Sequence, residues 1–275
     1  MRGIEAMNEQ LSKIVKEFDD PKRFAGVLLV GSEARGDASL YSDVDIVFYA
    51  FEEPSDEHEK YRLTYRKGRL ISLSIKTLSA ARAAFSNPVE AIRTIQGLRD
   101  STVLRDSSSA DVARLKQAAQ EFVWTPKLQA AANREASYQL MGNAEEVHKV
   151  LRGLSECNDL ILLNGAWGLA IAMPLVMALK HNILAAGDNH FRSQVCQAVG
   201  AASRWTAFHA ISIGTSTGPS GQSQLAQQAI GGFWLYEETV RLASDILLPR
   251  DTAVIEGALC LARESRLIPP AVPAK

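Results

Sequence analysis

The chain has 275 residues, with 30 Lys and Arg against 31 Asp and Glu, and 47% of its residues are hydrophobic. The near balance of charges argues against a protein that holds nucleic acid or an anionic membrane by bulk charge. The hydrophobic content excludes a disordered chain. The three cysteines, Cys157, Cys196 and Cys260, have neither a disulfide framework nor a zinc-binding spacing. Because the first eleven residues also lack the apolar run of a signal peptide, we expect a cytoplasmic protein.

The first part of the chain, residues 1–124, reads as mixed α/β. Apolar residues recur at helical spacing over 4–18, which predicts a helix. The run Phe24–Val30 is apolar throughout, as in a strand buried on both faces, and Asp43–Tyr49 is expected to form a second strand. These features predict an α/β (α+β) domain with a small mixed sheet.

A hairpin is expected next. Tyr61–Arg66 alternates between apolar and polar residues, Lys67-Gly68 can turn the chain, and Arg69–Ile75 returns. Ser109 is expected to cap a helix that runs to about Phe122.

The second part, residues 125–275, reads as an all-α helical bundle. Thr125-Pro126 is a good start for a long helix, because Thr can cap it and Pro suits its first turn. Apolar periodicity predicts further helices over 157–181, 190–199, 201–212, 223–247 and 251–265. The segment Leu160–Leu179 is apolar enough to span a membrane, but it is rich in Ala and Gly and contains Pro174, so we expect a buried helix instead.

The most informative segment is GSEARGD at 31–37, followed by Ser42-Asp43-Val44-Asp45. A buried strand that ends at Gly31 and continues into a short helix at Ser32 exposes backbone N–H groups, which suits a phosphate. Asp43 and Asp45 are two residues apart on a strand, so both carboxylates face the same way. Two such oxygen ligands favour Mg²⁺ when substrate phosphates complete its coordination, although they also fit a plain solvent-facing strand.

This pattern resembles the signature of the polymerase-β-like nucleotidyltransferases, and the helical half looks most like the kanamycin nucleotidyltransferase branch. The resemblance implies transfer of a nucleoside monophosphate, AMP from ATP or one from another nucleotide, to a hydroxyl of a small molecule. Aminoglycoside modification, hence antibiotic resistance, is the example that this branch suggests. The expected partners are a nucleotide and a small-molecule acceptor; with the charge balance above, no nucleic-acid or membrane partner is expected, and a homodimer is.

The resemblance also implies a role for particular residues. Asp43 and Asp45 would hold Mg²⁺, and Gly31, Ser32 and Arg35 would bind the nucleotide phosphates. In the helical half, Glu145 would be the general base and Lys149 would contact a phosphate, with Glu146 as the alternative base.

One position departs from the family pattern. The strand expected at Arg69–Ile75 usually supplies a third carboxylate, and here Ser72 occupies that position. Two alternatives therefore stay open: an enzyme that works with two aspartates, or a nucleotide-binding sensor without catalysis. A third reading comes from Arg204 and His209, whose spacing resembles the ribonuclease motif of HEPN toxin domains, in which case the protein would belong to a toxin–antitoxin pair.

Overall fold

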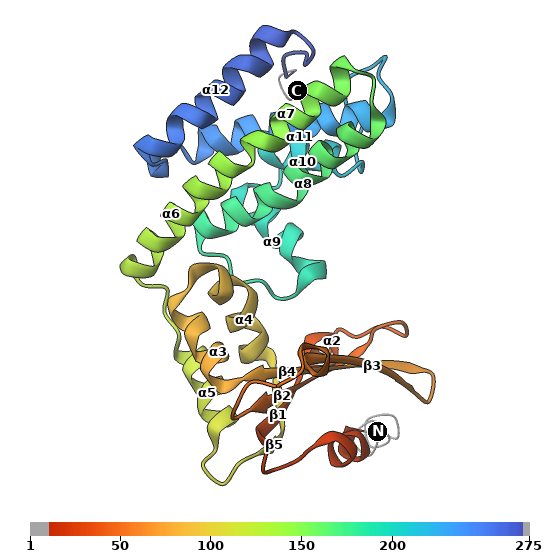
Figure 1. The fold of residues 1–275 in the computed structure, drawn as a ribbon, viewed down its shortest axis with the longest axis vertical. Coiled ribbons are helices and arrows are strands. Elements are labelled where there is room, and N and C mark those ends of the chain that lie inside the picture. Colours follow the sequence, from red (N-terminus) through yellow and green to blue (C-terminus); the bar gives the residue numbers. More distant parts are fainter. Residues whose placement is uncertain (1–10, 272–275) are drawn as a thin grey trace. The chain divides into compact units, whose positions relative to one another are not determined.

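The structure, a computed structural model, describes residues 11–271. The chain forms two compact units (Figure 1). The first runs to Val123 and includes the later segment Leu184–Gly187, whereas the second consists of Trp124–Ile183 and the residues from Asp188 onward. The first unit is built on a β-sheet, and the second is helical.

The first unit contains a five-stranded mixed sheet with the strand order β3-β4-β2-β1-β5. Its strands are β1 (Phe24–Val30), β2 (Val44–Ala50), β3 (Tyr61–Arg66), β4 (Arg69–Thr77) and β5 (Thr102–Asp106). Residues 11–18 are helical, and the other helical segments are α2 (Gly31–Arg35), η1 (Glu57–Lys60), α3 (Leu78–Ala83), η2 (Ala84–Ser86), α4 (Pro88–Asp100) and α5 (Asp111–Glu121).

The mixed sheet confirms the predicted fold class. β2 and β4 run parallel, and the other neighbouring strands are antiparallel. β1 forms where it was predicted. The hairpin also forms, with β4 running two residues further than predicted, to Thr77. The strand predicted over Asp43–Tyr49 is shifted by one residue, to Val44–Ala50. The first part of the helix predicted over 4–18 lies outside the described residues. Ser109 does not cap α5 as predicted, because the Asp106 carboxylate accepts the N–H groups at its start.

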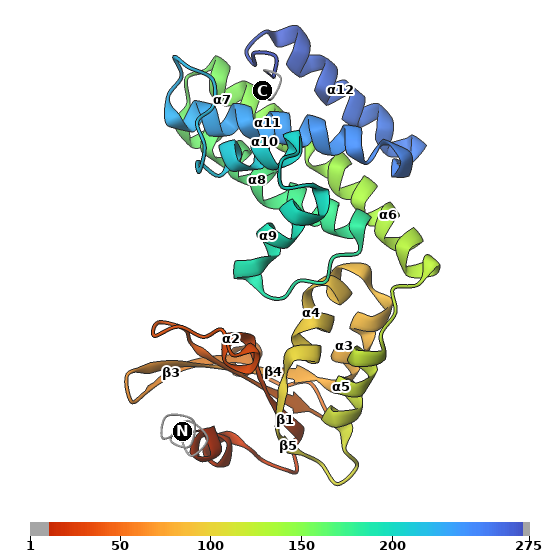
Figure 2. The same cartoon turned by 180° about the vertical axis from the view of Figure 1, so that it is seen from behind.

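The two faces of the sheet are covered differently (Figures 1 and 2). Alternate residues of β2, Val44, Ile46 and Phe48, pack with helix 11–18 in the main apolar core. The intervening residues, Asp45, Val47 and Tyr49, face the side where α4 lies. The core therefore fixes which side chains of β2 point to the other face.

The second unit is a helical bundle, as predicted. Its elements are α6 (Pro126–Gly142), α7 (Ala144–Ser155), α8 (Asp159–His181), α9 (Asp188–Val199), α10 (Arg204–Ser212), α11 (Gln224–Leu242), η3 (Ser244–Ile246) and α12 (Pro249–Ser265). Thr125 caps α6 as expected, because its hydroxyl accepts the N–H of Leu128. The helix predicted over 223–247 ends at Leu242.

α8 is long and apolar enough to cross a membrane by length and composition. It packs against α6, α7 and α11, and half of its most apolar stretch is buried among them. Its remaining face exposes Leu160, Trp167 and Ile171. This packing is that of a central bundle helix, as predicted, although one stripe of it stays uncovered within the second unit.

Candidate functional site

The site begins where β1 ends and the chain turns directly into α2. Gly31 stands at this junction with φ +71°, a backbone conformation that strains residues with a Cβ. A Cβ added at Gly31 would overlap the Oδ2 atom of Asp45. Glycine is therefore required for two separate reasons, the backbone angle and the close approach to a carboxylate.

Asp45 lies in β2, paired with Val30 of β1 on one side and Ser72 of β4 on the other. Burial raises the pKa of Asp45 above its ordinary value, and the nearby charge of Asp43 raises it further. A hydrogen bond from Ser72 and the charge of Arg35 act in the opposite direction. The structure thus brings together the two predicted aspartates, at a place where their negative charges repel each other.

Ser72 is the residue for which the resemblance implies a third carboxylate. It is the bridge partner of Asp45, its side chain is buried, and it donates a hydrogen bond to the Asp45 carboxylate. Hydrogen bonding of this kind favours the charged form of an acid. Ser72 therefore helps to keep Asp45 ionised. A carboxylate in the same position would instead raise the pKa of Asp45 by charge repulsion.

We expect Ser72→Ala to raise the pKa of Asp45 still further, because the hydrogen bond that favours the ionised form is lost. The resemblance implies that Asp45 holds Mg²⁺, for which it must be ionised. As the solution is acidified, Mg²⁺ binding by Ser72→Ala is therefore expected to be lost at a higher pH than in the wild type. Titration of Mg²⁺ binding between pH 4 and 8 measures the shift, and equal acidic limits in wild type and Ser72→Ala would contradict the role given to Ser72.

Arg69 contacts both parts of the motif, the short helix α2 and the residue just before Asp43. Arg69 of β4 forms an ion pair with Glu33 of α2, in which both side chains are largely buried. It also donates a hydrogen bond of 3.3 Å to the backbone carbonyl of Ser42, just before Asp43. This pairing across 36 residues has no local sequence signal, so the sequence analysis did not find it.

Arg35 lines a small cavity together with two other cationic side chains. Its guanidinium contacts Asp37 at 3.2 Å, and its side chain is largely buried. The cavity has a volume of about 160 Å³ and is lined by Val30, Gly31, Arg35, Val47, Tyr49, Lys76, Arg93, Thr94, Gly97, Leu98, Ala185, Ala186 and Gly187. Three of these side chains are cationic and none is acidic, so the cavity favours an anion.

Lys76 and Arg93 were missed by the sequence analysis. Lys76 lies on β4, four residues after Ser72 and therefore on the same face of the sheet as Asp45. Arg93 comes from α4, for which the analysis predicted no helix. The segment Leu184–Gly187 belongs to the same unit and is fastened to α4 by a 2.8 Å hydrogen bond from Ala185 N–H to the Ile92 carbonyl.

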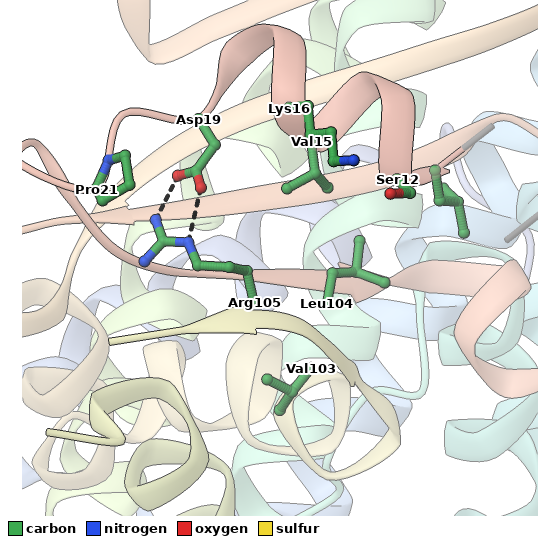
Figure 3. A pocket seen from close by; sticks show the side chains of 9 residues that line it. Ser12, Val15, Lys16, Asp19, Pro21, Val103, Leu104 and Arg105 are labelled. Atoms are coloured by element: carbon green, nitrogen blue, oxygen red, sulfur yellow. Dashed lines mark hydrogen bonds and ion pairs between the residues drawn. The ribbon is translucent and has the colours of Figure 1, made fainter. Parts of the chain in front are cut away.

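A larger cavity, of about 580 Å³, lies between helix 11–18 and β5 (Figure 3). Arg105 spans it with a pair of hydrogen bonds to Asp19, and it also donates to the backbone carbonyls of Phe24 and Ala25. The charges of Arg105 and Asp19 thus pair with each other, and this contact joins the end of helix 11–18 to the sheet. None of the residues predicted to carry chemistry lines this cavity, so size alone does not identify the site.

The second unit contains the other predicted site residues, on α7. Lys149 forms an ion pair of 2.7 Å with Glu146 rather than with Glu145. Glu146 also packs against Gly168 of α8, where an added Cβ would lie 2.6 Å from its carboxylate. Glu145 is exposed and lines a different, open cavity of about 300 Å³ beside His148. The residue that α8 and Lys149 hold in one place is therefore Glu146.

Arg204 and His209, the residues of the HEPN-like string, are placed for packing. His209 is 3% exposed, its ring stacks on Trp205, and its Nε2 atom has no hydrogen-bond partner in the part of the chain that the structure describes. Burial lowers the pKa of His209 to about 4, with the charge of Arg192 adding to the effect. Arg204 lies over the ring of Phe208. A buried, neutral imidazole does not supply the proton that cleavage of RNA requires.

His209 should instead make the protein sensitive to acid. The pKa is about 4 in the folded chain against 6.5 in the unfolded one, so the unfolded state binds the proton first. Stability is then complete above pH 6.5 and falls as the pH drops toward 4, by up to about 3 kcal/mol. We expect His209→Phe to remove most of this loss in urea unfolding at pH 7 and pH 5. An unchanged difference between the two pH values would contradict this assignment.

Part of the first unit matches a known family model. Residues 9–90 match the family model of the nucleotidyltransferase domain, and this segment includes Gly31, both aspartates and Ser72. A solved structure of a nucleotidyltransferase-like protein from Exiguobacterium sibiricum 255-15 is similar at 13% identity and a TM-score of 0.48, over 87% of this chain and 78% of that one. The comparison with curated proteins found no match. The family model supports nucleotidyl transfer as the general chemistry of the first unit.

Proposed function

We propose that this chain transfers AMP from ATP to a hydroxyl group of a small molecule and releases pyrophosphate. The observation that carries the proposal is the approach of Gly31 to Asp45, with Asp43 beside it, inside the segment that matches the nucleotidyltransferase domain. In this reaction the acceptor oxygen forms a bond to the α-phosphorus of ATP. The bond between that phosphorus and the bridging oxygen to the β-phosphate breaks, and the proton of the hydroxyl passes to a base.

The two aspartates fit a Mg²⁺ ion that also binds the phosphates of ATP. Both supply hard oxygen ligands, and their mutual repulsion, seen in the raised pKa of Asp45, is relieved by a cation. No group of three or more His, Cys, Asp or Glu side chains within residues 11–271 is arranged to hold a metal. Bound to Asp43 and Asp45, the ion would neutralise charge on the phosphates.

The cations beside α2 suit the phosphates that leave. Arg35, Lys76 and Arg93 line a cavity that begins at Gly31 and contains no acidic side chain. They would bind the β- and γ-phosphates electrostatically, as the family resemblance implies for Ser32 and Arg35. Positioning and charge stabilisation then supply most of the rate, as in other phosphoryl transfers.

The family resemblance implies a general base on α7, and we expect Glu146→Gln to slow turnover more than Glu145→Gln does. Glu146 is held by Lys149 and by its packing against Gly168, whereas Glu145 is exposed. A base in a fixed position contributes about a hundredfold or more. Steady-state rates with saturating ATP and acceptor measure the effect for each variant. A greater loss in Glu145→Gln would return the role to the residue first predicted from the sequence.

A nucleotide sensor without catalysis is the second candidate, and Ser72 is the observation that favours it, since the third carboxylate is absent. Aminoglycosides remain the acceptor class that the family branch suggests, and the homodimer stays a prediction.

The test is pyrophosphate release from Mg²⁺-ATP in the presence of a panel of hydroxyl acceptors. Release that depends on an acceptor supports the transferase. ATP binding with no release for any acceptor favours the sensor.

A further inference from the structure

The cavity of about 160 Å³ between the sheet and α4, here called the α4 cavity, contains a buried hydroxyl group without a partner. Tyr49 of β2 lines this cavity and is 2% exposed. Its hydroxyl makes no hydrogen bond with any of residues 11–271, and it is not sealed from solvent. Because a buried polar atom is ordinarily paired, the Tyr49 hydroxyl is a donor that opens into the α4 cavity and has no acceptor in the described chain.

Two further groups that line the α4 cavity are also unused. Lys76 is the direct bridge partner of Tyr49, so both side chains point to the same side of the sheet. Lys76 forms no ion pair with an acidic residue of the described range, whereas Arg35 is already paired with Asp37. The hydroxyl of Thr94, on α4, likewise makes no hydrogen bond within that range. Hydroxyl donors and an unpaired ammonium group therefore line one small space.

The size and the chemistry of the α4 cavity select a small anion. Its volume is below the roughly 300 Å³ at which pockets for drug-sized ligands begin, so it suits one part of a nucleotide rather than the whole molecule. Burial raises the pKa of Tyr49, and its hydroxyl therefore keeps the proton that it can donate. Hydroxyl and ammonium donors together suit an oxyanion, which accepts several hydrogen bonds at once. A phosphate group meets these conditions.

The α4 cavity begins at the candidate catalytic site and extends away from it. Gly31, which lines the cavity, is the residue whose added Cβ would overlap Asp45. The pair of Tyr49 and Lys76 lies four residues beyond Asp45 along β2, which is roughly 13 Å at the rise of a strand. A phosphate held by this pair is therefore well separated from one at Asp45. In a nucleoside triphosphate, the terminal phosphate is the one farthest from the α-phosphate that reacts.

We propose that the α4 cavity binds a phosphate group, with the Tyr49 hydroxyl and the Lys76 ammonium as its donors. The inference rests on the proposed function, because the group that reaches the cavity from Asp45 is the γ-phosphate of the donor nucleotide. The β-phosphate of a diphosphate stops short of this pair. Tyr49 is then the residue by which the chain prefers ATP to ADP. A free phosphate ion has the same chemistry, and the test separates these two sources.

The test measures binding of ATP, ADP and inorganic phosphate to the full chain by calorimetry, with Mg²⁺ and without acceptor, so that it does not depend on turnover. We expect ATP to bind about tenfold more tightly than ADP. Tyr49→Phe, which removes only the hydroxyl oxygen, should weaken ATP binding about tenfold and leave ADP binding unchanged. Tyr61→Phe, at an exposed position on β3, is the matched control and should keep the preference.

A second variant fills the α4 cavity and leaves its donors in place. Gly97 lines the cavity from α4, and an added Cβ there would meet no neighbouring atom of the described residues within 4 Å. Gly97→Leu should therefore occupy the cavity and reduce the affinity for ATP to that for ADP. The fold should survive, because leucine favours a helix more than glycine does. Gly257→Leu, at an equally open position on α12, is its matched control.

Binding of ATP and inorganic phosphate that is unchanged in both Tyr49→Phe and Gly97→Leu would overturn the proposal. Weaker ATP binding in these variants supports the γ-phosphate as the bound group. Loss of inorganic phosphate binding alone, with ATP binding unchanged, supports the phosphate site and assigns it to the free ion.

The failure of this inference is distinguishable from the failure of the proposed function. Weaker ATP binding in Tyr49→Phe, with no pyrophosphate release by the wild type for any acceptor, would keep the phosphate site and reject the transferase. Acceptor-dependent release by the wild type, with ATP and phosphate binding unchanged in both variants, would keep the transferase and reject the site.

Discussion

Replacing Asp45 with asparagine is expected to abolish acceptor-dependent pyrophosphate release, with a loss of about a thousandfold or more. The same change should leave the protein as stable as the wild type, or more stable. The reason is the raised pKa of Asp45: burial and the charge of Asp43 both disfavour its ionised form in the folded chain. Removing that charge relieves the repulsion at neutral pH.

Thermal unfolding of the Asp45→Asn variant, measured beside its turnover, checks both parts of this expectation. Asp100→Asn, at the end of α4 in the same unit, serves as the control and should retain activity. A variant that turns over normally would show that Asp45 holds no cation. A variant that unfolds at much lower temperature would show that the carboxylate has a structural role instead.

Gly31→Ala is expected to lower both stability and activity. The backbone angle at this position costs about 1–2 kcal/mol for a residue with a Cβ. In addition, the new methyl group would overlap Oδ2 of Asp45, so either the turn into α2 or the carboxylate must move. We therefore expect a loss of stability greater than the cost of the angle alone, together with a loss of turnover.

Gly36→Ala separates these two effects. Gly36 has a similar angle, φ +81°, but an added Cβ there would meet no atom of the described residues within 4 Å. Urea unfolding measures the loss in free energy of unfolding for each variant. The loss in Gly36→Ala gives the cost of the backbone angle, and the additional loss in Gly31→Ala gives the cost of the overlap with Asp45. Equal losses of stability, with normal turnover in Gly31→Ala, would remove Gly31 from the site.

The parts of the fold that follow local rules could be predicted from the sequence. β1 is a continuous apolar run, and Tyr61–Arg66 alternates strictly before the turn at Lys67-Gly68. The motif from Gly31 to Asp45 is also local, because a turn and two aspartates on one strand need no distant partner. Thr125 and Pro126 predict the start of α6 for the same reason.

The rest depends on pairing between distant segments. β5 is short and carries Arg105 and Asp106, so neither alternation nor apolar content marks it as a strand. Its place beside β1 comes from tertiary contacts, including the ion pair of Arg105 with Asp19. The contact between Arg69 and Glu33 is equally non-local.

The candidate site shows the same division. Asp45 could be named from the motif, but the sequence could not show that Lys76 and Arg93 line one cavity with Arg35. That fact follows only from the packing of α4 on the sheet. The sequence also could not show that Glu146, rather than Glu145, is held against α8, since both residues lie in the first turn of α7.

The proposed nucleotidyl transfer is tested most directly by following labelled α-phosphate from ATP to a hydroxyl acceptor, with the full chain and Mg²⁺. We expect a labelled product whose formation requires the acceptor, with an equal amount of pyrophosphate, and no product from Asp45→Asn. Labelled product formed equally well by Asp45→Asn would contradict it. Mg²⁺-dependent ATP binding without labelled product from any acceptor would contradict the transferase and leave the sensor.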